Sequence, residues 1–355
     1  MKCSPQNPNH PSRPHWALLC VAFAVSGLLY SAAVSADEQE QPAAADANAN
    51  QQTADDAKVV DQTGDDILTQ VREKLSSLDS LSCDLHQTVS FSGMQIIAAG
   101  RYVQASGDRV RLDFRLFPAK ARQVGDQVSA SPDGDSADSP DGPANSEEPE
   151  EMRGALTQVC DGNVLHTVYR NGEQVRVTRR NIRDVLAAAR QSAALGADAG
   201  LKDLGVGGLR ALLSRIQTDM EFAPVKESRI AEVRFYTLVG RWTPASMTRL
   251  FQVPEGTEVL PAEYLPEYVR ILVDADSMLP RRIQYLKRSV TENETMVRPI
   301  VTLDLRNIEL NKPLGNDVFA FSPPEGVSEE DVTDQTINLI QQLSTSPPSG
   351  TPPDQ

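Results

Sequence analysis

The pattern that most constrains the fold of this chain is an alternation of apolar and charged residues with a period of two. The segment "RVRLDFRLF", residues 109–117, places four apolar side chains on one face, namely Val110, Leu112, Phe114 and Leu116. Because successive side chains of a strand point to opposite faces, this segment is a strand with one dry face and one wet face. Strands of this type are typical of an antiparallel sheet that covers a core on one side.

Other segments have the composition of strands joined by tight turns. Residues 158–180 are predicted to form hairpins, because Asp161-Gly162 and Asn171-Gly172 are dipeptides that favour short turns between paired strands. Further strands are predicted at 85–104 (one or two strands, with turns at Ser92-Gly93 and Ser106-Gly107), 231–243, 267–275, 281–289 and 299–310.

Helices interrupt this series of strands. Thr63 and Asp66 can form a capping box, and apolar residues then recur at helical spacing, which predicts a helix over 65–79. Two more helical segments lie near 181–193 and 208–220. A helix, antiparallel strands, a helical section and further strands indicate an α+β protein, in which a strongly curved antiparallel sheet carries helices on one side.

The first 36 residues have the pattern of a cleaved signal peptide. Lys2 and Arg13 precede an apolar run at 16–30, and small residues around 31–36 form a cleavage site that ends at Ala36. The alternative is an uncleaved membrane anchor, since residues 16–36 contain no charge. We expect cleavage, and hence a protein that is periplasmic or otherwise exported.

The net charge of −15 comes from two acidic tracts. Residues 37–66 hold nine Asp and Glu with one Lys, and residues 126–151 hold nine Asp and Glu with no Lys or Arg. The first 36 residues add two positive charges, so the rest of the chain is neutral, which gives no electrostatic basis for binding nucleic acid. Such polar segments cannot offset the entropy of ordering. Disorder is therefore predicted for a tether over 37–63, an insertion over 123–153 and a tail over 344–355.

The sequence contains no recognisable catalytic or metal-binding motif. No nucleophile elbow, zinc-protease motif, C-x-x-C pair, P-loop or dinucleotide-binding glycine run is present. His86 follows Cys83 by three residues on a predicted strand, so the two side chains point to opposite faces, which argues against a catalytic pair. Asp274 and Asp276 fit turn chemistry better than a metal site. We expect no enzymatic activity, no metal and no cofactor.

Two cysteines remain after the predicted cleavage, Cys83 and Cys160. In an oxidising compartment they can form a disulfide. Their separation in sequence neither supports nor excludes it, so a disulfide and two free buried thiols are equal alternatives.

A short strand and a helix are predicted near the C-terminus. Phe319 and Phe321 alternate, so both can enter the dry face of a last strand, which Pro323-Pro324 ends by removing two hydrogen-bond donors. A capped helix over 328–343 follows.

Four motifs occur in order along the chain: "LSCDLHQTVSFSG" with "GRYVQASGDRVRLDF", "VCDGNVLHTVYRNGEQV", "VDADSMLPRRIQYL" and "FAFSPPEGVSEED". Together they resemble motifs of the LolA-like family of periplasmic lipoprotein carriers. The last is similar to the F-x-F-x-P-P-x-G-V strand that ends the unclosed β-barrel of that family. The carriers have Arg-Pro at the end of the second strand, whereas this chain has Ser106-Gly107 there.

The resemblance implies a single domain over 64–343, an unclosed half-barrel with helices over its open side and a cavity for acyl chains. It also implies that the protein binds a lipid or the acyl chains of a lipoprotein, and we expect a monomer. Alternation along the strands selects the candidate lipid-binding residues Val89, Phe91, Val110, Leu112, Phe114, Phe235 and Leu303. A solid core is the alternative to a cavity. In that case the chain would be an envelope interaction or sensor module that binds a protein partner.

Overall fold

The computed structural model describes residues 58–91, 94–118, 154–191, 207–230, 232–251, 265–290, 295–315 and 317–345. The signal segment, most of the predicted tether, the predicted insertion and most of the predicted tail lie outside these residues.

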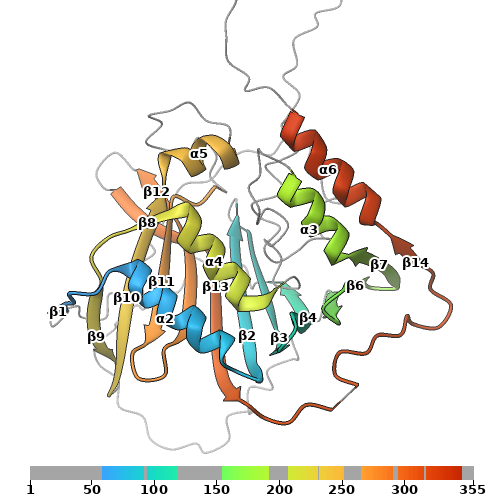
Figure 1. Ribbon diagram of the computed structural model, residues 1–355, viewed down its shortest axis with the longest axis horizontal. Coiled ribbons are helices and arrows are strands. Elements are labelled where there is room, and N and C mark those ends of the chain that lie inside the picture. The colour runs from blue at the N-terminus through green and yellow to red at the C-terminus, as the bar shows by residue number, and fades with distance from the viewer. Residues whose placement is uncertain are drawn as a thin grey trace, which may run out of the picture.

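One large sheet organises the described residues (Figure 1). Its strands are β1 (Lys58–Val59), β2 (Ser80–Phe91), β3 (Met94–Ala105), β4 (Arg109–Pro118), β5 (Gly154–Cys160), β6 (Val164–Asn171), β7 (Gln174–Asn181), β8 (Met220–Phe222), β9 (Lys226–Ile230), β10 (Val233–Trp242), β11 (Tyr268–Asp274), β12 (Leu279–Val290), β13 (Thr295–Leu310) and β14 (Glu329–Asp331). The strand order is β1-β9-β10-β11-β12-β13-β2-β3-β4-β5-β6-β7-β14, and β8 pairs with β10. The order begins at β1 and ends at β14 without returning, so the sheet is unclosed, as the resemblance implied, and the elements confirm the predicted α+β class.

Two antiparallel meanders make up this sheet. Strands β2 to β7 pair in chain order, β9 to β13 do the same, and the pairing of β13 with β2 joins them. Short turns explain this topology, because Gly107, Gly162 and Gly172 adopt positive φ between consecutive strands, where L-residues are strained. The three turns predicted at these glycines are confirmed, whereas the turn predicted at Ser92-Gly93 lies outside the described residues.

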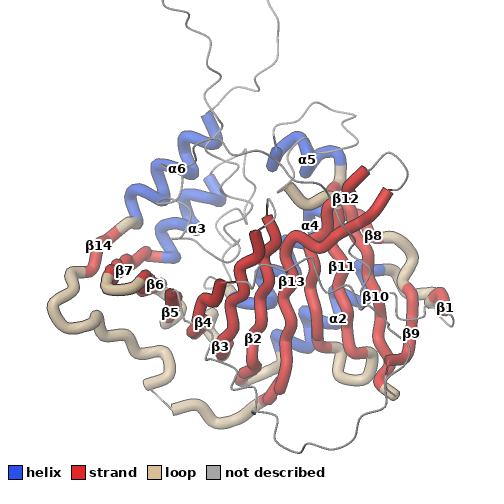
Figure 2. The backbone as a smooth tube through the Cα atoms, turned by 180° about the vertical axis from the view of Figure 1, so that it is seen from behind, coloured by secondary structure: helices blue, strands red, loops and turns tan. Residues whose placement is uncertain are grey.

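Two helices lie across one face of the sheet. Helices α2 (Gly64–Ser76) and α4 (Gly208–Asp219) run in front of the strands in Figure 1. The rear view in Figure 2 shows the strands without a described helix in front of them. At the start of α2, the Asp66 amide donates to Thr63 Oγ1 and the Thr63 amide donates to the Asp66 carboxylate, which confirms the predicted capping box. The helices therefore give the sheet an inner face, covered by α2 and α4, and an outer face.

Three further helices lie beyond this pair. Helix α3 (Ile182–Gln191) packs beside α6 (Thr333–Thr345) through a small apolar cluster of Val185, Ala189, Ile337 and Ile340, and α5 (Pro244–Phe251) follows β10. Of the helices that the structure describes, none combines the length and apolar character needed to cross a membrane.

The predicted strand at Phe319 and Phe321 is wrong. Residues 317–319 form a turn, because the Val318 amide donates to the Gly315 carbonyl and the Ala320 amide donates to the Asp317 carbonyl. Residues 317–328 accordingly belong to no strand. Phe319 packs instead with Val103 and Ala105, outside the main core.

The helix predicted from residue 328 begins later, at Thr333. Residues 329–331 form β14, which pairs with β7 in the parallel sense. The Asp331 carboxylate then accepts bonds from the amide and hydroxyl of Thr333 and starts the helix. Pairing with a strand edge therefore replaced the first turn of the predicted helix.

The segment between β13 and β14 runs outside the sheet to reach β7 (Figure 2). The His166 Nδ1 atom lies 2.7 Å from the Glu329 carboxylate, and the rings of His166 and Phe321 stack with centroids 4.4 Å apart. The Arg111 guanidinium also bonds the Val318 carbonyl. These contacts attach the C-terminal segment to the outer face, on the side away from α2 and α4.

Candidate lipid-binding face

The inner face of the sheet is a continuous apolar surface. Its strand residues form one buried cluster with the apolar sides of α2 and α4. Helix α2 contributes Ile67, Leu68, Val71 and Leu75, and α4 contributes Leu209, Leu212, Leu213 and Ile216. The helical spacing of the first set predicted this packing, and the structure confirms it.

Strand register arranges the inner face in rows, because cross-strand partners stand on the same face of a sheet. One row runs across β12, β13, β2, β3, β4 and β5 as Ile283, Leu303, Gln87, Ala98, Leu116 and Gly154. The next runs across β13, β2, β3, β4 and β5 as Leu305, Leu85, Gly100, Phe114 and Leu156. Ten of the eleven positions are apolar or glycine. Gln87 is the exception.

Five of the seven candidate residues lie where the alternation placed them. Val89, Val110, Leu112, Phe114 and Leu303 belong to the inner-face cluster, and each exposes 6% of its surface or less. The structure therefore brings these side chains together on one surface. Phe91 is the last residue of β2, and its side chain lies outside the described part of the structure.

The placement of Phe235 on the dry face is wrong. Its neighbours Tyr236 and Leu238 pack with the inner-face cluster, so alternation along β10 directs Phe235 to the outer face. Its cross-strand partner Asp274 agrees, because the apolar inner-face partner is the adjacent Val273. The segment "VRFYTLVGRW" carries apolar residues on both faces, so its sequence period did not decide the orientation.

Cys83 and Cys160 lie on the inner face as two thiols that form no disulfide, which excludes the disulfide alternative. Strands β3 and β4 lie between β2, which holds Cys83, and β5, which holds Cys160. Three strand spacings amount to about 14 Å, whereas a disulfide needs Cα atoms about 4.4–6.8 Å apart. Burial raises the pKa of the Cys83 thiol to about 12, so this thiol is not an activated nucleophile.

A polar clamp seats the first residues of α4 on the sheet. The Leu209 amide donates to the Tyr102 hydroxyl at 3.0 Å and to the Gln104 side-chain oxygen at 3.2 Å, and that hydroxyl donates to the same Gln104 oxygen at 2.7 Å. Burial raises the pKa of Tyr102, so its hydroxyl keeps its proton. An ion pair between Arg210 and Asp108, at 2.9 Å, adds a second attachment. The sheet thereby caps a helix whose own N-cap residue, Gly207, has no side chain to do so.

Gln87 is a candidate ligand contact that the sequence pattern did not single out. Its side chain exposes 1% of its surface, and neither its amide nitrogen nor its oxygen has a hydrogen-bond partner among the described residues. A signal was present in the sequence, because Gln87 occupies the dry-face position between Leu85 and Val89.

Charged side chains also enter the interior, near α5, as ion pairs. Arg215 pairs with Asp219, which also bonds the Ser246 hydroxyl, and Lys287 lies 2.8 Å from Glu267. Pairing of this kind is the condition under which charges are tolerated in a protein interior. These residues therefore have a structural explanation.

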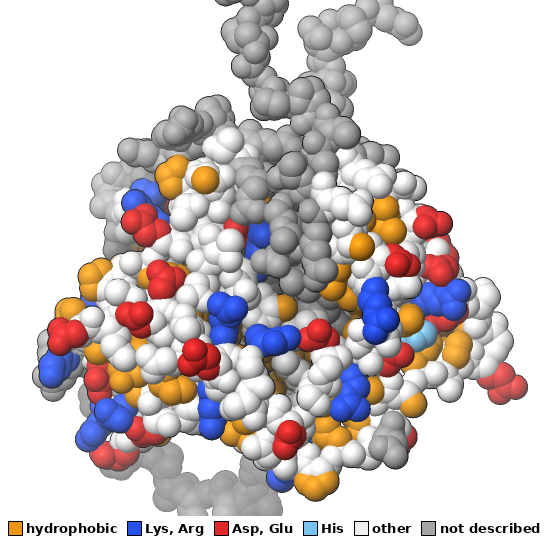
Figure 3. Space-filling view, in the orientation of Figure 1, with side chains coloured by type: hydrophobic (Ala, Val, Ile, Leu, Met, Phe, Trp, Pro, Cys, Tyr) orange, Lys and Arg blue, Asp and Glu red, His pale blue; other side chains and the backbone are white. Residues whose placement is uncertain are grey.

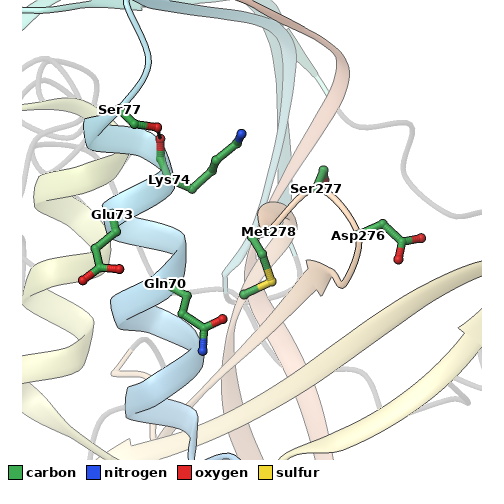
Figure 4. Close-up of a pocket in the computed structure, with 7 residues that line it drawn as sticks. All are labelled: Gln70, Glu73, Lys74, Ser77, Asp276, Ser277 and Met278. Carbon is green, nitrogen blue, oxygen red and sulfur yellow. Dashed lines mark hydrogen bonds between the residues drawn. The ribbon is translucent and has the colours of Figure 1, made fainter.

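An open pocket of about 450 Å³ lies between α2 and the turn that joins β11 to β12 (Figure 4). Its lining is Gln70, Glu73, Lys74, Ser77, Asp276, Ser277 and Met278. Met278 is the single apolar side chain of this set, so the pocket does not suit an acyl chain. In the part of the chain that the structure describes, no group of three or more His, Cys, Asp or Glu could hold a metal ion.

The helix-bearing side has no charge patch of one sign. Lys and Arg are interspersed with Asp and Glu over its described residues (Figure 3). Such a surface provides no strong field to attract a polyanion. The apolar inner face is thus the surface with the clearest chemical character.

No family model matches the chain, and no curated protein matches it in sequence. Solved structures that are similar to it include the lipoprotein LppX of Mycobacterium tuberculosis, with 9% identity and a TM-score of 0.33 over 70% of this chain and 97% of that one. A DUF1329 family protein from Desulfovibrio piger has 8% identity and a TM-score of 0.29, over 72% and 95% of the two chains. LprF from Mycobacterium bovis has 10% identity and a TM-score of 0.27, over 71% and 94%. Each TM-score is below 0.5, so these likenesses assign the chain to no family.

Proposed function

We propose that this chain is an exported, monomeric protein that binds a lipid, or the acyl chains of a lipoprotein, on its inner face. The observation that carries the proposal is the continuous apolar surface of an unclosed sheet, beneath helices that are not hydrogen-bonded into the sheet as strands are. The motif resemblance to the LolA-like carriers supports the same ligand class. The protein would act by binding and not by catalysis.

Apolar contact is the source of affinity in this proposal. Each buried methylene contributes about 0.8 kcal/mol. A 16-carbon chain that exchanges water for the inner face would gain on the order of 10 kcal/mol before the costs of association and ordering. If half of the chain stayed in contact with water, the gain of about 6 kcal/mol would only match the cost of association, so a stable complex requires most of the chain to be buried.

Entry of a ligand would require α2 and α4 to move as a pair. The Arg72 guanidinium bonds the Gln217 side-chain oxygen at 2.7 Å, and the Gln217 amide bonds the Asp65 carbonyl at 3.1 Å and the Thr69 hydroxyl at 3.0 Å. These bonds tie the two helices to each other. The clamp at Tyr102 then provides a fixed point about which the pair can swing.

Native mass spectrometry tests this function on the fragment from Asp37, purified without detergent from a bacterial periplasm. We expect a stoichiometric adduct that organic extraction identifies as an acyl lipid. A bare protein mass, together with failure to take up added 1-palmitoyl-lysophosphatidylcholine, would contradict the proposal. The same spectrum reads the oligomeric state.

A protein partner is the second candidate, and the free edge of the sheet favours it. Only two residues of β1 pair with β9, and the adjoining Ile230 and Val233 expose 49% and 38% of their surfaces. An exposed strand edge with apolar side chains can accept a strand from another protein. A bare mass in the experiment above would direct the search to this edge.

A further inference from the structure

We infer that Gln87 is the polar anchor of the lipid site, and that the ligand is an acyl lipid whose ester or amide carbonyl accepts a hydrogen bond from the Gln87 side-chain amide. The inference rests on the proposed function, and it selects lipids with a linked carbonyl over bare hydrocarbon chains.

The Gln87 side chain is buried although its polar atoms are unpaired within the described part of the chain. It is 99% buried, yet both polar atoms lack a hydrogen-bond partner among the described residues. More than nine in ten buried polar groups in native structures have a partner, because leaving one unpaired destabilises the fold. A buried amide that lacks a partner within the chain is explained if a bound ligand supplies one.

The Gln87 side chain projects from the inner face of the sheet. Its cross-strand partners Leu303 and Ala98 both belong to the inner-face cluster, so Gln87 projects from the same face. Ile283 and Leu116 extend the row on either side and are also buried and apolar. The amide therefore stands within the surface that would contact acyl chains.

The surface beside Gln87 is formed by small residues. Ala98 lies next to it, and Gly100 and Gly154 lie in the same or the adjacent row, so three positions carry at most a methyl group. A Cβ at Gly100 would lie 1.7 Å from the Asp113 carbonyl oxygen, and one at Gly154 would lie 2.7 Å from the Arg170 carbonyl oxygen. Close strand approach thus fixes both glycines, and the floor beside the amide stays low.

Gln87 differs from the other inner-face polar residues, because both of its polar atoms are buried without a partner among the described residues, whereas Thr167 on β6 has one such atom, its hydroxyl oxygen. Tyr102 and Gln104 bond each other and the start of α4. A primary amide offers two donors and one acceptor oxygen, so it can bond a carbonyl through its nitrogen. A free carboxylate would bring a charge into this apolar surface at a much higher desolvation cost, so a neutral ester or amide is the chemistry that fits.

Two probes test the anchor directly, because they differ only in the carbonyl. They are 1-palmitoyl-lysophosphatidylcholine, which has an ester, and 1-O-hexadecyl-lysophosphatidylcholine, which has an ether. Each displaces N-phenyl-1-naphthylamine from the mature protein in a fluorescence titration. We expect the wild-type protein to bind the ester about threefold to tenfold more tightly, the range of one neutral hydrogen bond.

The variant Gln87→Leu keeps a side chain of similar length and removes the amide. It should bind both probes with equal affinity and unfold at the same or a higher temperature than the wild-type protein. Gln284→Leu is the matched control, because Gln284 lies on the outer face of β12, between the inner-face residues Ile283 and Tyr285. This control should keep the ester preference.

Each other result overturns the inference. Equal wild-type affinity for ester and ether, or an ester preference that survives in Gln87→Leu, would show that lipids bind without the anchor, and the proposed function would stand. A large fall in the unfolding temperature of Gln87→Leu would show that the amide has a partner within the chain. If neither probe nor the dye binds to the wild-type protein, the proposed function fails as well.

Discussion

At the scale of single residues, burial on the inner face removes the reactivity of the two thiols. Cys83 and Cys160 expose 0% and 1% of their surfaces, and burial raises the pKa of Cys83 to about 12. The mature chain should therefore show two thiols per molecule with Ellman's reagent in guanidinium without reductant, and almost none within minutes in the folded state. Ser106→Cys, at an exposed turn, is the control and should react at once. Fewer than two thiols in guanidinium would contradict a structure in which the two cysteines form no disulfide.

Asp274 organises the turn between β11 and β12, as its turn-type sequence predicted. Its carboxylate accepts bonds from the amides of Asp276 and Ser277 and from the Arg281 guanidinium. Burial by itself would raise the pKa of Asp274, but the Ser277 amide and Arg281 outweigh that effect, so the pKa lies below its usual value. The folded protein therefore favours the charged form.

The sign of the resulting pH dependence follows from linkage. A carboxyl group whose pKa is lowered by folding contributes stability above its unfolded pKa of about 3.9, and this contribution is lost as the pH falls through the folded value. Asp274→Asn should lower the free energy of unfolding by about 1–2 kcal/mol at pH 7. In urea titrations the difference should shrink as the pH falls below about 4. Asp276 lies in the same turn but is largely exposed, so Asp276→Asn should change the free energy of unfolding little at any pH. If Asp274→Asn lowered the free energy of unfolding equally at every pH, the lowered pKa of Asp274 would be contradicted.

Single residues also show what the sequence pattern could and could not decide. Leu112 was placed correctly, because its neighbours in "RVRLDFRLF" are charged and only one face of that strand is apolar. Phe235 was not, because apolar residues occupy both faces of its strand, and packing of β10 against α2 places Tyr236 and Leu238 on the inner face. The unpaired state of Gln87 depends on what surrounds it in three dimensions, and alternation can identify its face but not its partners.

At the scale of elements, α4 depends on a glycine that touches the sheet. Gly208 has a φ of +63°, and a Cβ there would lie 2.4 Å from both the Tyr102 hydroxyl and the Gln104 side-chain oxygen. Gly172, in the turn between β6 and β7, has a φ of +56°, and a Cβ there would meet no atom within 4 Å. The two glycines therefore share the backbone strain and differ in the contact.

This pair separates strain from contact in one experiment. Gly172→Ala should destabilise the protein by about 1 kcal/mol, the cost of a left-handed L-residue. Gly208→Ala should destabilise the protein by about 1–3 kcal/mol more than Gly172→Ala does, because the new methyl group displaces the clamp that seats α4. Urea titrations of both variants measure the difference. Equal losses would show that the contact between α4 and Tyr102 carries no stability.

Elements near the C-terminus show the limit of local pattern. The alternation of Phe319 and Phe321 predicts a strand, but each residue found a partner on the outer face instead: Phe319 packs with Val103 and Ala105, and Phe321 stacks on His166. Those partners are more than 150 residues away in sequence, so no local signal could reveal them. The pairing of β14 with β7, which shortened the predicted helix, has the same origin.

At the scale of the whole molecule, stability is distributed unevenly between the centre and the edges of the sheet. The centre is β13, β2 and β3, long strands paired on both sides, whereas β1 has two residues and β14 has three. Helices α2 and α4 are held to the sheet through side chains and the clamp at Tyr102. Local openings of low free energy are therefore expected at β1, β9 and β14, and openings of intermediate free energy at the two helices.

Hydrogen exchange can identify which of these openings a ligand suppresses. If lipid lies between the inner face and the helices, an opening of α2 and α4 releases it, and a ligand present at 100 times its dissociation constant stabilises the closed state by about 2.7 kcal/mol. Exchange of the protected amides in both helices should then slow by up to about 100-fold when 1-palmitoyl-lysophosphatidylcholine is added. The amides of β9 exchange by fraying of the sheet edge, which keeps the ligand in place, so their rates should not change. If the slowing occurred at β9 and not in the helices, the ligand would occupy the free edge, and the apolar inner face would be a core and nothing more.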